Sequence, residues 1–92
     1  MKNKLTITWH TTEKGVEYFI DRISMGFGET GFRNILKYIS ITEGINKIII
    51  KYPAANNTGE DVMKSFPFYS SLEEFMKIIA QKSISTEYEP QF

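Results

Sequence analysis

Three glycines stand at a spacing that can cradle a phosphate group, Gly26-x-Gly28-x-x-Gly31, between a strand-like run and a helical pattern. Such glycines let the backbone turn tightly and approach a ligand, while the free N–H groups of the first helical turn point at an anion. Glu29 lies inside the motif and would repel a phosphate. The segment therefore has two interpretations: a small phosphate-ligand or nucleotide binder, and a plain turn between strand and helix.

A second group of chemically capable residues lies between Pro53 and Ser71, after an isoleucine run. Its polar members are Asn56, Asn57, Thr58, Glu60 and Asp61. Open α/β sheets bind ligands at the carboxyl ends of their strands, which is where this segment would begin. Glu60 and Asp61 could act as acid and base or bind a hard cation, and the chain would then be a small enzyme or enzyme subunit. Adjacent carboxylates in a first helical turn also serve as capping charges.

The same segment ends in Phe66, Pro67, Phe68 and Tyr69, a run too apolar for a purely solvated loop. Either these rings complete a small core, or Phe68 and Tyr69 are anchors of a partner-binding surface, since buried aromatics carry much of the energy of an interface. We predict that Asn56, Asn57, Thr58, Phe68 and Tyr69 contact a protein partner or a second copy of the chain.

Other kinds of site lack the residues they need. His10 is the only histidine and the chain has no cysteine. A catalytic triad, a histidine-rich metal centre or a thiol nucleophile cannot be built from this set. We therefore predict no catalytic residue, no metal site and no cofactor.

Composition limits the class of protein further. Ninety-two residues fit a single domain spanning 1–92, and 41% of them are hydrophobic, which is enough for a core. Eleven basic and eleven acidic residues cancel, so the field that draws proteins to nucleic acid or anionic lipid is missing. With no apolar stretch near the length of a membrane span and no signal-peptide pattern, we expect a cytoplasmic protein without nucleic-acid or membrane partners.

Four segments have the pattern of strands. Residues Leu5–His10 alternate between apolar and polar, as in a strand with one buried face. Val16–Ile23 is rich in β-branched and aromatic residues and predicts a mostly buried second strand. Asn46–Tyr52 contains three consecutive isoleucines, which predicts a central strand covered on both faces. The tail at Ile84–Glu89 alternates again and could add an edge strand before Pro90.

Two segments have the pattern of helices. Phe32, Ile35, Leu36 and Ile39 share one helical stripe, with Thr30 as the expected N-cap and Gly44 as the expected C-terminal stop. Leu72, Phe75, Met76 and Ile79 share another, with Ser71 expected to cap it and Lys82 at its end. The fold class is α/β: a small mixed sheet of three to four strands with two main helices, in the order β-β-α-β-α-(β).

This order of elements resembles the STAS domain, which is named for sulfate transporters and anti-sigma-factor antagonists. In that family a serine of an Asp-Ser-Ser-Gly motif caps the helix after the central strand and is phosphorylated in many bacterial members. The matching residues here are Tyr69-Ser70-Ser71-Leu72, so the aspartate and the glycine of the motif are replaced. The resemblance implies a non-enzymatic regulatory module that binds a protein partner, with Ser70 as the phosphorylation site; helix capping is the alternative role for Ser70.

Overall fold

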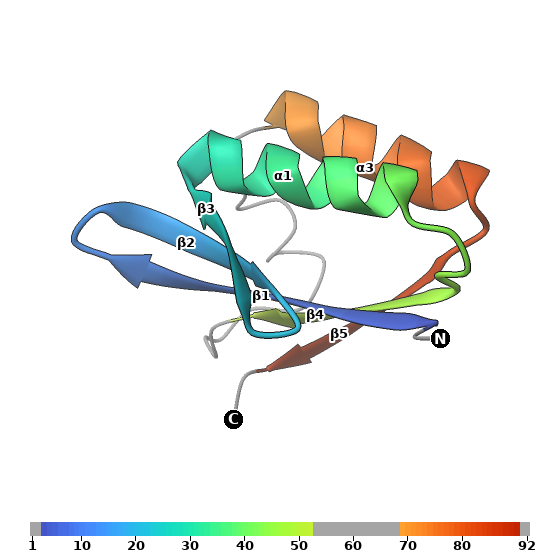
Figure 1. Cartoon of the computed structure of the whole chain (residues 1–92), viewed down its shortest axis with the longest axis horizontal. Coiled ribbons are helices and arrows are strands. Elements are labelled where there is room, and N and C mark those ends of the chain that lie inside the picture. Colours follow the sequence, from blue (N-terminus) through green and yellow to red (C-terminus); the bar gives the residue numbers. More distant parts are fainter. Residues whose placement is uncertain (1–2, 53–68, 91–92) are drawn as a thin grey trace.

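A computed structural model describes residues 3–52 and 69–90 of the chain, which form five strands and two helices (Figure 1). In chain order the elements are β1 (Lys4–Thr12), β2 (Gly15–Ile20), β3 (Ile23–Phe27), α1 (Gly28–Ile41), β4 (Lys47–Tyr52), α3 (Tyr69–Gln81) and β5 (Ser85–Pro90). The strands make one mixed sheet in the order β3-β2-β1-β4-β5. The first three strands are antiparallel, whereas β1, β4 and β5 run parallel.

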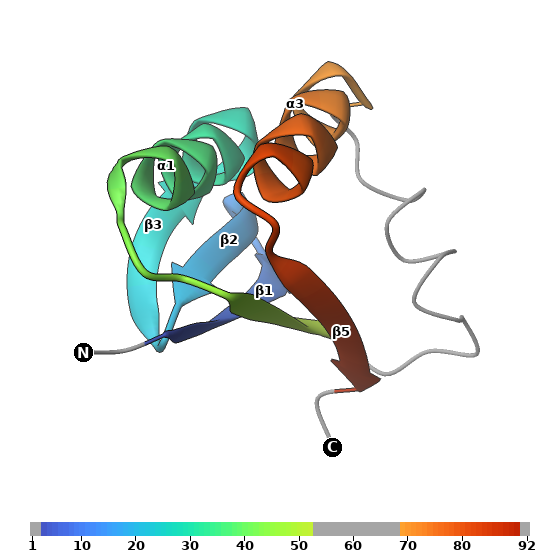
Figure 2. The ribbon, with the colours of Figure 1, turned by 90° about the vertical axis from the view of Figure 1, so that its right-hand side faces the viewer.

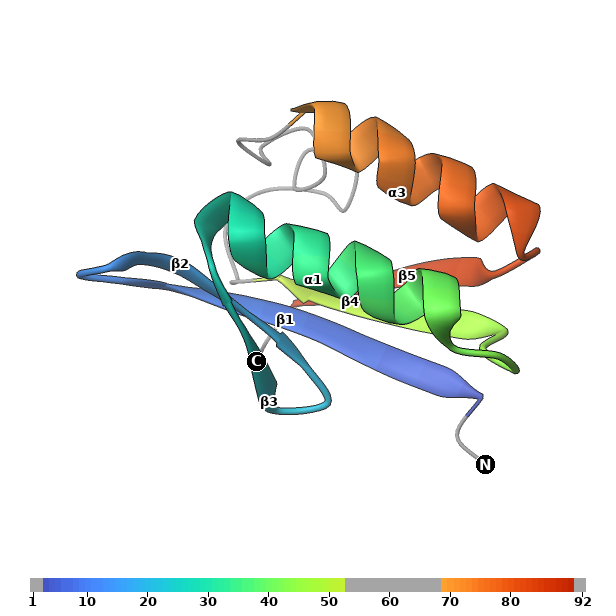
Figure 3. The same cartoon turned by 45° about the horizontal axis from the view of Figure 1, so that its top comes forward.

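Both helices lie on the same face of the sheet (Figures 1 and 2). They lie side by side across it, α1 over the antiparallel strands, as Figure 3 shows from above. The rings of Phe32 on α1 and Phe75 on α3 have centroids 6.2 Å apart, and both residues are fully buried. The helical stripes predicted from sequence therefore meet in one core between helices and sheet, with one exception: Met76 is 49% exposed.

The fold class is as predicted, but the sheet has five strands instead of three or four. The predicted second strand, Val16–Ile23, ends at Ile20, because Asp21 and Arg22 form a two-residue turn; the chain then returns as β3, most of which the sequence predicts to be the turn before the helix. Two-residue hairpin turns are usually marked by Asn-Gly or Asp-Gly, and this one carries neither. The tail forms the edge strand β5, which completes the sheet.

The central strand β4 is buried on both of its faces, as the isoleucine run predicts. Ile48, Ile49 and Ile50 are all buried, but both helices cover the face to which Ile48 and Ile50 belong. Ile49 is 8% exposed and lies outside the core cluster, on the face opposite the helices. In the part of the chain that the structure describes, that second face carries no helix, and we call it the open face.

The helix ends also differ from those expected. Helix α1 starts at Gly28 with Phe27 in the N-cap position, so Thr30 lies inside it, and it ends at Ile41, before Gly44. The carbonyl groups at this end of α1 accept hydrogen bonds from Lys82, which follows α3. The Lys82 Nζ donates to the Ile39 oxygen at 2.9 Å and to the Thr42 oxygen at 3.0 Å. Helix α3 starts at Tyr69, which places Ser71 within the helix. Neither helix has the length and apolarity needed to cross a membrane.

Candidate functional site

The predicted glycine motif lies at the junction of β3 and α1. Gly26 belongs to β3, Gly28 is the first residue of α1, and Gly31 is buried in its first turns. A methyl group on Gly31 would clash with the carbonyl oxygen of Gly26 and press on the ring of Tyr18, so the missing side chain lets α1 approach the sheet closely. Gly26 and Gly28 have φ angles of 113° and 59°, a region that favours glycine. Packing and backbone geometry thus account for all three glycines.

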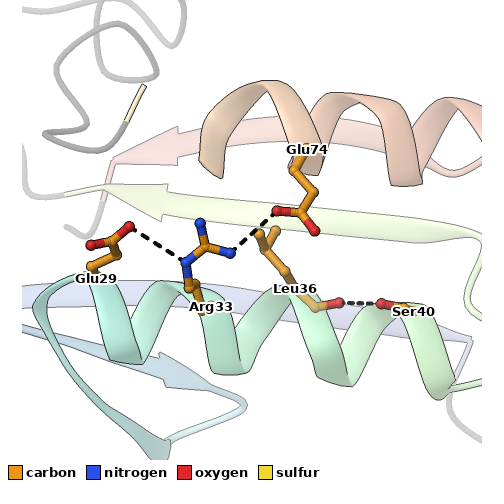
Figure 4. A network of polar contacts seen from close by, with 5 residues as sticks. All are labelled: Glu29, Arg33, Leu36, Ser40 and Glu74. Atoms are coloured by element: carbon orange, nitrogen blue, oxygen red, sulfur yellow. Dashed lines mark hydrogen bonds and ion pairs between the residues drawn. The ribbon is translucent and has the colours of Figure 1, made fainter. Parts of the chain in front are cut away.

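The start of α1 already holds an anionic group. Glu29 lies in the first turn, and its Oε1 accepts from the Arg33 Nε at 3.4 Å (Figure 4). Arg33 also donates through Nη1 to Glu74 on α3, again at 3.4 Å, so the network links the two helices. These ion pairs are about half exposed and individually weak. A phosphate at this helix end would face the Glu29 carboxylate, which favours the turn interpretation of the motif.

The predicted partner-binding and phosphorylation residues fall largely beyond what the structure describes. Asn56, Asn57, Thr58 and Phe68 lie outside the described residues, as do Glu60 and Asp61 of the enzyme hypothesis. Tyr69 and Ser70 are the first two residues of α3. Ser70 therefore lies in the first turn of α3.

An apolar surface that the sequence interpretation missed lies where β3 meets α1. Its members are large side chains, several of them strongly exposed. Ile23 and Ile41 are each 68% exposed, Tyr38 is 38% exposed, and Met25 is partly buried against the core. We call Ile23, Met25, Tyr38 and Ile41 the β3–α1 surface.

Two observations show that this surface is continuous. Ile23, Met25 and Tyr38 line one groove of about 200 Å³, together with Ile20 and Asp21. Ile41 is three residues after Tyr38 on α1 and so shares its side of the helix. That side faces β3, because Asn34, four residues before Tyr38, donates from its side-chain amide to the Met25 carbonyl at 2.7 Å. Strand and helix together therefore present one apolar patch.

The two edges of the sheet differ in chemistry. Strand β3 forms one edge, and none of its residues Ile23–Phe27 is charged. Strand β5 forms the other, and it carries Glu87, Glu89 and Pro90. Charged residues and proline at an edge discourage pairing with another chain, whereas an uncharged edge leaves it open. Of the two edges, the β3 edge is thus the one less protected against pairing with another chain.

The sequence did contain a signal for this surface. Asn34, Tyr38 and Ile41 stand at i, i+4 and i+7, which predicts a second stripe on α1 beside the buried one. Its link to Ile23 and Met25 could not be predicted, because the second strand is predicted to end at Ile23 and the glycine segment after it is predicted as a turn, so no further strand is expected there. Within the two described ranges, no three acidic or histidine side chains converge to hold a metal ion.

Comparison of the chain with family models, with curated proteins and with solved structures finds no match.

Proposed function

We propose that this protein is a non-enzymatic interaction module that binds a protein partner through the β3–α1 surface. The observation that carries the proposal is the exposure of Ile23 and Ile41, at 68% each, beside an uncharged edge strand. Large apolar patches on otherwise polar proteins mark sites of association. The occupant fitted to such a patch is an apolar segment of another protein, which would fill the groove beside Tyr38 and cover the β3 edge.

Folding does not explain these exposed side chains. The core is complete without them, because the buried cluster is formed by other residues of the same elements, such as Ile35 and Ile39 on α1. Leaving Ile41 in water forgoes the roughly 2 kcal/mol that burial of an isoleucine side chain supplies. Contact with a partner would recover that free energy.

The test compares two substitutions of exposed apolar residues on different helices. Ile41→Lys puts a positive charge into the β3–α1 surface, near the C-terminal end of α1, where a positive charge is tolerated. Met76→Lys puts the same charge at an exposed position on α3, outside that surface. We expect Ile41→Lys to weaken partner binding by about 2 kcal/mol, or roughly thirtyfold, and Met76→Lys to change it little. Affinity capture followed by titration of the recovered partner, with sedimentation equilibrium for self-association, measures both. Equal binding by the two variants would remove the surface from the proposal.

The predicted 53–71 region is a second part of the same proposal. Its anchors would be Phe68 and Tyr69, and the double change Phe68→Ala and Tyr69→Ala should then weaken partner binding by more than about 2 kcal/mol. The far-ultraviolet circular dichroism spectrum should stay native. A double variant that loses its fold would make these aromatics part of the core.

Regulation at Ser70 extends the proposal along the STAS resemblance. A phosphate at the N-terminal end of α3 would sit favourably against the helix dipole and the free N–H groups there. Phosphorylation could therefore change partner binding without unfolding α3. Phosphopeptide mass spectrometry on the protein from its own cells, with Ser70→Asp and Ser70→Ala in the binding titration, tests this; equal affinities of both variants and no phosphopeptide would remove Ser70 from the proposal.

A further inference from the structure

The open face of the sheet contains a polar pocket of about 430 Å³. The described residues that line it come from three parts of the fold: Thr6 and Thr8 on β1, Lys51 on β4, and Asp21 and Arg22 in the β2–β3 turn. Its volume falls within the range of about 300 to 1,000 Å³ that small-molecule sites occupy. The alternation of β1 points Thr6 and Thr8 away from the core, and the parallel register sets Thr8 opposite Lys51.

The turn that brings Arg22 to the pocket is unfavourable for Arg22 itself. Asp21 and Arg22 have φ angles of 48° and 74°, the left-handed conformation that hairpin turns of this kind usually give to Asn or Asp followed by Gly. Glycine in place of Arg22 would relieve that strain. Non-glycine residues in this conformation cluster where a protein needs the side chain, and here the side chain retained is a guanidinium.

The turn is also held in place. The Asp21 N–H donates to the Thr6 carbonyl at 2.9 Å, and the Thr6 N–H donates to the Asp21 Oδ1 at 3.1 Å. One carboxylate oxygen of Asp21 is thereby bound to the sheet backbone. The contact fixes the start of the turn against β1 and so positions Arg22 next to the threonines.

We propose that this pocket binds a phosphate group of a small organic molecule. Arg22 supplies a planar set of donors, Lys51 a second positive charge, and Thr6 and Thr8 two hydroxyl groups, which together suit the oxygens of a phosphate. Even with the Asp21 carboxylate counted, the charges of the described side chains that line the pocket sum to one positive charge, which attracts an anion. The remaining volume accommodates the organic part of the ligand.

The experiment titrates the protein with inorganic phosphate and with phenyl phosphate at constant ionic strength, followed by the backbone amide signals of Thr6 and Thr8 in NMR spectra. We expect saturable shifts of these signals and tighter binding of phenyl phosphate, because inorganic phosphate leaves most of the pocket unfilled. No saturable shift with either compound overturns the proposal, and so does binding of inorganic phosphate alone.

Two variants and two controls locate the site. Arg22→Gly should weaken phenyl phosphate binding at least about tenfold and raise the melting temperature, since the strain of the turn is relieved; Lys51→Met should weaken binding to the same degree. Lys47→Met removes a positive charge from the same strand and face, where Lys47 pairs with Glu87 at 2.8 Å, and should leave binding nearly unchanged. If Lys47→Met weakens binding as much, the effect is one of general charge and the pocket is rejected. If Gly28→Ala abolishes binding while Arg22→Gly retains it, the ligand belongs to the glycine motif and the pocket is again rejected.

Discussion

The two faces of the sheet are made by alternate residues of the same strands, yet they have opposite chemistry. On β1, Leu5 and Ile7 are 2% exposed beneath the helices, whereas Thr6 and Thr8 point to the open face and line its pocket. On β4, Ile50 belongs to the core and its neighbour Lys51 belongs to the pocket. The covered face consists of apolar side chains that are buried in the core, whereas the open face carries polar side chains that take no part in the core.

This difference separates what holds the fold from what is available for binding. The covered face contains nearly all of the buried apolar side chains, and removing water from them is the main source of stability. Among the described residues, the larger apolar side chains of the open face are Phe19, Phe27 and Ile49, and of these only Ile49 is buried, so this face adds little apolar burial. Substitutions should therefore act on stability from one face and on ligand binding from the other.

The largest effect is expected on β4. Ile50→Asp places a carboxylate in the core, where Ile50 is 2% exposed, and should reduce the free energy of unfolding by about 4 kcal/mol or more. Ile49→Asp should cost clearly less, because the Ile49 side chain lies outside the core cluster and points to the open face. Urea denaturation followed by circular dichroism measures both. Equal losses would mean that the two faces are equally part of the core.

The next largest loss of stability is expected where α1 packs closely on the covered face. Gly31→Ala should lower the free energy of unfolding by about 2 kcal/mol, because the new methyl group meets the Gly26 backbone. Gly28→Ala should cost about 1 kcal/mol, from its positive φ alone, since no atom lies near the new group. The same urea experiment separates them, and the reverse order would show that helix packing is not what requires glycine here.

The buried phenol of Tyr18 should make stability depend on pH in the alkaline range. It is 1% exposed on the covered face, and burial raises its pKa from 10 to about 12. Between these values the unfolded chain loses the phenol proton while the folded chain keeps it, so stability falls as pH rises, by about 3 kcal/mol in all. Tyr18→Phe should lack this part of the alkaline decline. Urea midpoints measured from pH 9 to 12 test it, and parallel curves for both proteins would contradict it.

The smallest effect is expected on the open face. Thr8→Val keeps the β-branched shape and removes the hydroxyl group from the pocket. The free energy of unfolding should change by no more than about 0.5 kcal/mol, as for surface positions generally, while phenyl phosphate binding weakens. A loss of stability comparable to that of Gly31→Ala would show that the open face is needed for folding, and the separation of the two faces would fail.

The sequence by itself determined the elements whose hydrophobic period is long and regular. The alternation at Leu5–His10, the isoleucine run at Ile48–Ile50 and the stripe from Phe32 to Ile39 each predicted the right kind of element, because burial of one face imposes that period. The fold class follows from their order. The strand break at Asp21 and Arg22 was missed, since neither residue is a usual marker of a tight turn.

Tertiary structure alone decided how these elements combine. A run of isoleucines cannot say which face the helices will cover, because that depends on how the connections place α1 and α3, and both lie on one side. The same holds for the two candidate sites. The β3–α1 surface joins Ile23 to Ile41, and the pocket joins Thr6, Arg22 and Lys51; neither group is close in sequence, so only the packing and register of the sheet bring its members together.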